Sequence, residues 1–233
     1  TYWQSDAVTH HWQGKLLDHP QSSFLLVLHN GAVAGLFRVP GVGTYRIRSS
    51  DKLGQIVEEI EDARFAPCGN TKDQAVNNPA QGGIAGPPPP PPPGCATFID
   101  VMVVYTPEAR DQQGGTAAIE AIGMLGIDDA NFSYSNSAIN PRVRLVYIGL
   151  TEYIESGSFF TELDLLTGNG DGSMDEVHAL RDQYGADLVT LLISHTQGGT
   201  ICGLGWLMGP PPSVTFAQYG FNVGNADCTA CGV

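Results

Sequence analysis

The sequence predicts an α/β fold in residues 97–233, a sheet with helices packed against it, preceded by a β-rich segment in residues 1–68. Two observations lead to this prediction. After residue 97, apolar runs of strand length alternate with segments of helical periodicity, whereas before residue 68 short alternating runs are separated by turn residues. Residues 69–96, rich in Asn, Gln, Gly, Ala and Pro, separate the two parts as a linker.

The first part of the chain is predicted to contain a β-hairpin. Phe24–His29 is an apolar run, and Ala32–Val39 alternates in polarity. Between them lies Asn30-Gly31, a dipeptide typical of tight turns because both residues tolerate positive φ angles. Two further strands are predicted at Thr44–Arg48 and Gln55–Ile60.

The linker ends in seven consecutive prolines, Pro87–Pro93. Such a run has no backbone donors and adopts polyproline II, so it extends roughly 22 Å at about 3.1 Å per residue. The charge balance changes across it. Residues 1–96 carry 8 Asp/Glu and 7 Lys/Arg, whereas residues 97–233 carry 16 Asp/Glu, 4 Arg and no Lys. This asymmetry supports a domain boundary near residue 96.

Phe98–Tyr105 opens the second part as a nearly continuous apolar run, which is typical of a strand buried on both faces. Thr116–Ser137 has helical spacing, although Gly123 and Gly126 weaken it. Four more strands are predicted, at Val143–Leu150, Asp187–Ser194, Cys202–Leu207 and Val214–Phe221.

A second helix is predicted at Ser173–Tyr184. Ser173 has the position of an N-cap residue, and Glu176 follows three residues later, as in a capping box. Gly185 stands where a C-cap glycine would end the helix. We interpret the preceding Gly170–Asp175 as a loop and helix cap, because Thr167 and His178 occupy ligand positions that a calcium loop fills differently.

Composition excludes several classes of partner. The net charge of −13, concentrated after residue 96, disfavours binding to nucleic acid or to anionic membranes. The sequence has no run of 18 apolar residues, so no transmembrane helix is predicted. The chain begins at Thr1 with no visible signal peptide, and we expect it to be a piece of a longer protein.

Five segments, taken in order, resemble the front part of the catalytic domain of reprolysin-like (metzincin) zinc peptidases. They are Phe98–Arg110, Asn131–Ile139, Arg144–Ser156, Met174–Leu192 and Cys202–Trp206. The resemblance covers about residues 98–228 and rests on the combination, since each segment alone is weakly specific. It implies a metzincin-type upper catalytic subdomain, which is a twisted mixed sheet with packed helices.

The resemblance also implies zinc as the cofactor and a protein or peptide as the substrate. The zinc helix of the family, HExxHxxGxxH, does not occur in residues 1–233. Two histidines at i and i+4 would bind the metal, and the glutamate between them would act as general base. No histidine of this chain has such a partner, so we expect no tightly bound catalytic zinc and no peptidase activity. The six histidines are His10, His11, His19, His29, His178 and His195.

Residues 12–68 resemble the end of the propeptide of the same family. The closing Pro67–Asn70 segment (PCGN) contains Cys68, which the resemblance implies as a zinc ligand that keeps a zymogen latent. The alternative is a structural or paired cysteine. Residues 69–96 would then contain the processing region.

Gly203, Leu204 and Gly205 match the family's strand at the upper rim of the cleft, which binds an extended substrate by backbone hydrogen bonds. The alternative is a glycine-rich edge strand without a ligand. Cys202 could be joined to Cys228 over this rim, or equally to Cys231.

We therefore predict a fragment of a secreted, zinc-dependent metalloendopeptidase precursor that would hydrolyse internal peptide bonds. Its parts are the propeptide end (1–68), the linker (69–96) and the incomplete catalytic domain (97–233). Without the zinc helix, one face of the sheet should be poorly covered. The alternative function is a non-catalytic secreted binding or adhesion module derived from such a peptidase. The sequence makes no prediction about oligomeric state.

Overall fold

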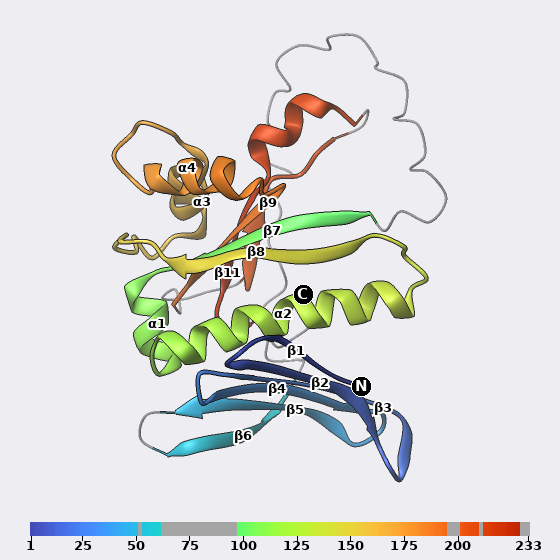
Figure 1. Ribbon diagram of the computed structural model, residues 1–233. Coiled ribbons are helices and arrows are strands. Elements are labelled where there is room, and N and C mark those ends of the chain that lie inside the picture. The colour runs from blue at the N-terminus through green and yellow to red at the C-terminus, as the bar shows by residue number, and fades with distance from the viewer. Residues whose placement is uncertain (51–52, 62–96, 195–200, 210–211, 229–233) are drawn as a thin grey trace.

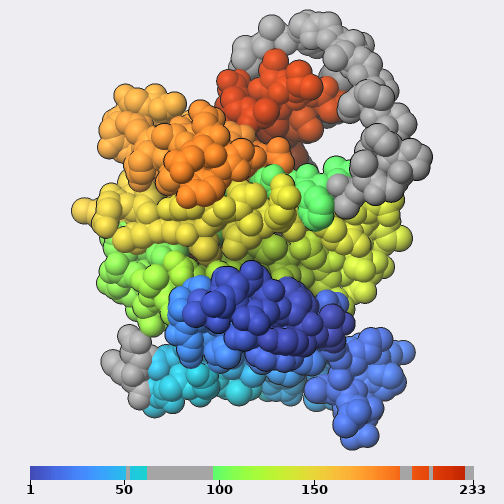
Figure 2. All heavy atoms as spheres, in the orientation of Figure 1, coloured from blue at the N-terminus to red at the C-terminus, as the bar shows by residue number. Residues whose placement is uncertain are grey.

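The computed structural model describes residues 1–50, 53–61, 97–194, 201–209 and 212–228. These residues form two β-sheets, and one long helix runs between them (Figure 1). The space-filling view shows the amino-terminal strands lying directly against the helix-containing part (Figure 2). The predicted linker, residues 69–96, lies outside the described residues, as do Cys68, His195 and Cys231.

The amino-terminal sheet has six antiparallel strands in sequence order. They are β1 (Tyr2–Asp6), β2 (Thr9–Leu16), β3 (His19–His29), β4 (Ala32–Val39), β5 (Gly43–Ser50) and β6 (Gly54–Ile60). The predicted hairpin is confirmed as β3–β4, with His29 opposite Ala32. Asn30 and Gly31 form its turn with φ angles of 47° and 83°, a conformation that asparagine and glycine adopt with little steric cost.

The second sheet has five strands in the order β10-β11-β9-β7-β8. They are β7 (Phe98–Tyr105), β8 (Arg142–Leu150), β9 (Leu188–Ile193), β10 (Gly203–Gly205) and β11 (Phe221–Asn225). Strands β8, β7, β9 and β11 pair in parallel, whereas β10 pairs antiparallel with β11 at the edge. The predicted mixed α/β architecture is confirmed.

Among the described residues, four α-helices and one 3₁₀ helix surround this sheet. They are α1 (Pro107–Gln113), α2 (Thr116–Asn136), α3 (Phe159–Thr167), α4 (Asp175–Tyr184) and the 3₁₀ helix η3 (Val214–Tyr219). Helices α3 and α4 pack on the side of the sheet that includes Met102, Val104, Leu191 and Val223. Helices α1 and α2 pack on the opposite side. No helix in the described part of the chain is long and apolar enough to cross a membrane.

Helix α2 is apolar on two sides because it packs against both sheets. Ile119 packs with Val101, Val103 and Tyr105 of the five-stranded sheet. Ala121 and Leu125 pack with residues of the amino-terminal sheet, including Leu25, Val27 and Leu36. Fully burying an aliphatic side chain stabilises the fold by about 1.5–3 kcal/mol. Burial of both helix faces therefore holds the two sheets on α2.

Two predicted elements are wrong in detail. Val214–Phe221 was expected as a strand, but Val214–Tyr219 is a 3₁₀ helix that starts where the Ser213 hydroxyl accepts a hydrogen bond from the Thr215 N–H group at 3.2 Å. Val214 is 82% exposed, so its β-branched side chain has no core to fill. The strand begins only at Phe221.

Helix α4 begins at Asp175, not at Ser173, and Met174 occupies the N-cap position in the left-handed conformation. The Asp175 carboxylate accepts the N–H groups of Gly170 and Gly172 at 2.6 and 3.1 Å. The Asp175 side chain therefore orders this loop. The sequence had instead predicted that Ser173 and Glu176 form a capping box there. The predicted end of the helix is confirmed, because Gly185 adopts φ 64° as the C-cap.

Candidate functional site

Strand β10 forms one edge of the five-stranded sheet. Its residues Gly203, Leu204 and Gly205 face Gly224, Val223 and Asn222 of β11. The Asn225 N–H group donates to the Cys202 oxygen at 2.9 Å, so Cys202 and Asn225 form a hydrogen-bonded pair of the antiparallel ladder. Such pairs alternate along the ladder.

The alternation determines which backbone groups of β10 face outward. Leu204 belongs to the next hydrogen-bonded pair, so its N–H and C=O groups point towards β11. The corresponding groups of Gly203 and Gly205 point to the outer edge, where no described strand pairs with them. An edge of this kind can bind an extended peptide by strand addition, and glycine lets a second backbone approach closely.

The side chain of Leu204 anchors β10. It is 3% exposed and packs with Phe221 and Val223 in the core beneath α3. At Gly205, an added Cβ atom would lie 3.3 Å from the Asn222 Cβ atom, which leaves little room for a side chain there. Along the strand, Gly203 and Leu204 are buried and Gly205 is partly exposed.

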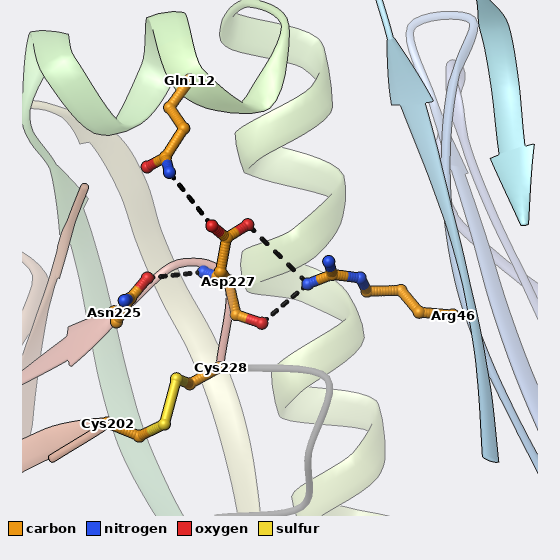
Figure 3. The surroundings of a disulfide bond; sticks show 6 residues. All are labelled: Arg46, Gln112, Cys202, Asn225, Asp227 and Cys228. Carbon is orange, nitrogen blue, oxygen red and sulfur yellow. Dashed lines mark hydrogen bonds and ion pairs between the residues drawn. A yellow bond between two sulfur atoms is a disulfide. The ribbon is translucent and has the colours of Figure 1, made fainter. Parts of the chain in front are cut away.

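A disulfide bond joins Cys202 to Cys228, with 5.7 Å between their Cα atoms. Cys202 immediately precedes β10, and Cys228 follows β11 by three residues (Figure 3). The bridge therefore ties the start of the edge strand to the turn that follows its neighbour. The sequence had left Cys231 as an equal partner, and Cys231 lies outside the described residues.

A hollow of about 560 Å³ lies beside β10, on the side of the sheet that carries α2. Most of its lining is aliphatic or small, with Ile122 and Gly126 contributed by α2, Leu192 by β9 and Gly224 by β11. Gly203, Gly205 and both bridged cysteines also line it. The expectation that one face of the sheet is incompletely covered stays a prediction.

Asp129 is a buried acidic group of α2 at the border of the hollow. Its neighbour Asp128 contacts His11 of β2, with 2.7 Å between Oδ2 and Nδ1. Burial raises the pKa of the Asp128 carboxyl above its ordinary value, and the adjacent His11 ring opposes this shift. Glu120, two turns earlier on α2, contacts His29 of β3 at 2.9 Å and accepts a hydrogen bond from the Tyr105 hydroxyl at 3.0 Å.

These contacts account for two of the histidines that we considered as metal ligands. His11 and His29 serve as partners of carboxylates on α2. His178 of α4 contacts the Leu166 oxygen at 3.2 Å and packs on the Phe221 ring. Within the described ranges, no three His, Cys, Asp or Glu side chains are grouped so as to hold a metal ion. The donors present there do not fit a tetrahedral zinc site, and no catalytic step is assigned to them.

In the acidic loop before α4, the carboxylates of Asp171 and Asp175 accept backbone N–H groups of the same loop. Asp175 accepts two backbone N–H groups, as described above, and Asp171 accepts the Ser173 N–H group at 2.9 Å. These hydrogen bonds order the loop, but the predicted helix cap is wrong, because Met174 occupies the N-cap position and makes no side-chain cap hydrogen bond.

Sequence reasoning missed Asp227 as a point of contact between parts of the chain. Its carboxylate accepts hydrogen bonds from Gln112 and Gln113 of α1 at 3.0 and 2.9 Å, and Arg46 of β5 reaches it from the amino-terminal sheet (Figure 3). The sequence offered one signal, since Asp227 directly precedes a cysteine that we expected to be bridged. Nothing in the local pattern connected it to residues more than a hundred positions away.

Comparisons with known proteins agree with the resemblance. The profile of the family described as "Metallo-peptidase family M12B Reprolysin-like" matches residues 96–220. A peptidyl-Asp metalloendopeptidase from Stenotrophomonas maltophilia is 31% identical over 206 residues, which cover 86% of this chain and 46% of that protein. A protein of the same name from Xanthomonas campestris pv. campestris is 26% identical over 202 residues, covering 85% of this chain and 46% of that protein.

The chain thus spans about half the length of the curated relatives that it matches. Among solved structures, metalloproteinase-II from Bacteroides fragilis aligns with a TM-score of 0.45 at 11% identity. The alignment covers 94% of this chain and 71% of that one.

Proposed function

Because the chain belongs to the M12B reprolysin-like metallopeptidase family, we propose that it is part of the precursor of a zinc-dependent endopeptidase. Residues 97–233 are the first part of the catalytic domain, residues 1–68 the end of a propeptide, and residues 69–96 the linker that is processed. The family match over residues 96–220 and the names of the relatives support this proposal.

The observation that carries the proposal is the edge strand β10. It lies antiparallel at the edge of an otherwise parallel sheet, is tied at its start by the Cys202–Cys228 bridge, and borders the hollow. The outward N–H and C=O groups of Gly203 and Gly205 would pair with the backbone of an extended substrate. Such pairing positions a peptide without selecting its side chains, as hydrolysis of varied protein substrates requires.

Zinc in the complete enzyme would polarise the scissile carbonyl and lower the pKa of a bound water. We propose that the ligands for it come from sequence that this chain does not contain, and that residues 1–233 alone neither bind catalytic zinc tightly nor cleave peptides. The backbone groups of Gly203 and Gly205 would hold and orient the substrate strand. Cys68, outside the described residues, stays a proposed latency ligand.

The names of the relatives suggest a substrate in which aspartate lies at the cleaved bond. Recognition of an aspartate side chain calls for a cation. Within residues 97–228 the arginines are engaged elsewhere: Arg110 and Arg144 with Asp111 and Asp100, and Arg142 and Arg181 with backbone oxygens. We therefore propose that the aspartate-binding cation, if this substrate class holds, comes from outside residues 97–228.

We propose an extracellular location for the protein. The Cys202–Cys228 bridge supports this, because disulfides persist mainly in oxidising compartments.

The test compares residues 1–233 with a longer chain read from the same reading frame. Both proteins are assayed for bound zinc and for cleavage of peptides that contain aspartate. The control is the longer chain with the glutamate of its HExxH motif replaced by glutamine. We expect cleavage by the longer chain alone, lost on chelation and in the glutamine variant. A longer frame without the motif, or an inactive longer chain, would overturn the proposal and favour the binding module.

A further inference from the structure

Arg46 of the amino-terminal sheet contacts the turn that carries the disulfide. Its Nη1 atom donates to the main-chain oxygen of Asp227 at 2.7 Å and lies 3.8 Å from the Asp227 Oδ1 atom. Figure 3 shows the guanidinium reaching this turn from the side of the molecule opposite Cys202. The two residues are 181 positions apart in the sequence, so this contact exists only while the sheet is docked on the rest of the chain.

Glu58 of the neighbouring strand β6 holds the Arg46 side chain in this position. The Arg46 Nε and Nη2 atoms donate to the Glu58 Oε2 atom at 3.2 and 2.7 Å, and the Arg46 side chain is 14% exposed. The remaining Nη1 group is therefore directed at Asp227 by a neighbouring strand. Charge-assisted hydrogen bonds of this kind, between a planar guanidinium and fixed acceptors, are stronger than neutral ones.

A short series of contacts leads from Asp227 to the edge strand. The Asp227 N–H group donates to the Asn225 Oδ1 atom at 2.8 Å, and the Cys228 N–H group donates to the Asn225 oxygen at 2.9 Å. Cys228 is bridged to Cys202, whose oxygen accepts the Asn225 N–H group. The turn Asn225–Cys228 and the first residue of the edge are thus one connected unit, and Gly203 follows directly.

We infer that the amino-terminal sheet regulates the order of the edge strand β10 through the contact between Arg46 and the turn Asn225–Cys228. While the sheet is docked, Arg46 holds the turn, protects the Cys202–Cys228 bridge and keeps the start of β10 in place. When the sheet leaves, the Asp227 oxygen loses its cationic donor, and the turn, the bridge and β10 become more mobile. The description of β10 as a substrate strand rests on the proposed function, whereas the mechanical connection does not.

Arg48 provides a matched control for Arg46. It lies two residues later on β5 and donates to the same Glu58 carboxylate, from Nε at 3.0 Å and from Nη2 at 2.7 Å. Its hydrogen bonds in the described structure go to Glu58 and not to Asp227. Arg48→Ala therefore removes an equal charge from the same strand and leaves the contact with the turn intact.

The experiment uses the whole 233-residue chain as wild type, Arg46→Ala and Arg48→Ala, with free thiols blocked beforehand. Reduction of the bridge under native conditions is followed by mass spectrometry of the labelled cysteines, together with amide hydrogen exchange of β10, β7 and the turn. We expect Arg46→Ala to accelerate reduction and exchange of the turn and β10 by about tenfold, the effect of losing a hydrogen bond to a charged group. Arg48→Ala and the amides of β7 should stay within about twofold of wild type.

Equal rates in Arg46→Ala and Arg48→Ala would overturn the inference, and so would an acceleration that includes β7, because the latter reports global unfolding. If Arg46→Ala does not fold, Arg46→Lys keeps the charge and loses the fork that reaches Glu58 and Asp227 together. It should accelerate reduction by a smaller factor, and unchanged rates in this variant would overturn the inference. None of these measurements needs peptidase activity, so their outcome is independent of whether the longer chain cleaves peptides.

Discussion

Arg38 of the amino-terminal sheet binds Asp129 of α2 through two parallel hydrogen bonds, from Nη1 to Oδ1 at 2.7 Å and from Nη2 to Oδ2 at 2.8 Å. The Asp129 side chain is 6% exposed and that of Arg38 31%. The pair thus joins two parts of the chain that the sequence places on opposite sides of a proline-rich linker. Together with the His11–Asp128 and His29–Glu120 contacts, it fixes the position of the sheet along the helix.

We predict that Arg38→Ala lowers the free energy of unfolding by roughly 2–4 kcal/mol, because it leaves the buried Asp129 carboxylate without this bidentate partner. Arg144→Ala serves as the control. That arginine pairs with Asp100, but its side chain is more than half exposed, so solvent screens the interaction and little change is expected. Urea denaturation of both variants measures the difference. Equal losses in the two variants would contradict a special role for the Arg38 pair.

Substitution by proline should have different effects at the two kinds of position in β10, those with an outward N–H group and those with an N–H group directed at β11. In the longer chain proposed above as the test of function, Gly205→Pro removes an outward N–H group and should raise KM for peptide substrates several-fold while the fold persists. Leu204→Pro removes an N–H group directed at β11 and should destabilise the domain by about 3 kcal/mol or more. Steady-state kinetics and thermal unfolding distinguish these results. An unchanged KM in a folded Gly205→Pro variant would show that substrate does not use this edge.

Acid should weaken the amino-terminal sheet through Glu58. Hydrogen bonds from Arg48 and then Arg46 lower the pKa of this carboxyl from 4.5 to about 2. Because the pKa is lower in the folded state, the stabilisation is fully present above about pH 4.5 and is lost as the pH falls towards 2. Glu58→Gln should therefore be less stable than wild type at neutral pH. The difference in stability between the two proteins should disappear as the pH falls from 4.5 to 2, because wild type loses the contribution of the Glu58 carboxylate. Denaturation midpoints across this range measure it, and a deficit independent of pH would contradict the assignment.

The two glycines of α2 that weakened the predicted helix should respond oppositely to substitution. A Cβ atom at Gly123 would lie 2.6 Å from the Ile148 Cδ1 atom of β8, whereas one at Gly126 meets nothing within 4 Å. Gly126→Ala should therefore raise the free energy of unfolding by about 0.5–1 kcal/mol through its higher helix propensity. Gly123→Val should lower it by about 1–3 kcal/mol, because Ile148 and Val103 must move. Chemical denaturation of the two variants measures whether the free energy of unfolding rises or falls. Stabilisation by Gly123→Val would contradict the close packing of α2 against Ile148 of β8.

Local patterns predicted most of the strands because their information is short in range. The hairpin at Asn30-Gly31 and the buried strand Phe98–Tyr105 were found from turn chemistry and apolar runs alone. Helix α3 (Phe159–Thr167) was missed, although Ser158 caps it by accepting a hydrogen bond from the Thr161 N–H group. Its buried Glu162 interrupts the apolar pattern, since that carboxylate folds back to the N–H groups of Ser156 and Gly157.

Local apolar patterns predicted the alternation of strands and helices after residue 97, because each pattern involves residues close together along the chain. The family and the edge strand were identified from the order of five segments, which the sequence also contains in full. Which distant residues contact one another became known only from the tertiary structure. These pairs are Arg46 with Asp227, His11 with Asp128, and Cys202 with Cys228. The tertiary structure also decided that Gly203 and Gly205 turn their backbone groups outward. These outcomes depend on strand register and on how α2 packs between two sheets, and both are set by the burial of apolar surface between segments far apart in sequence.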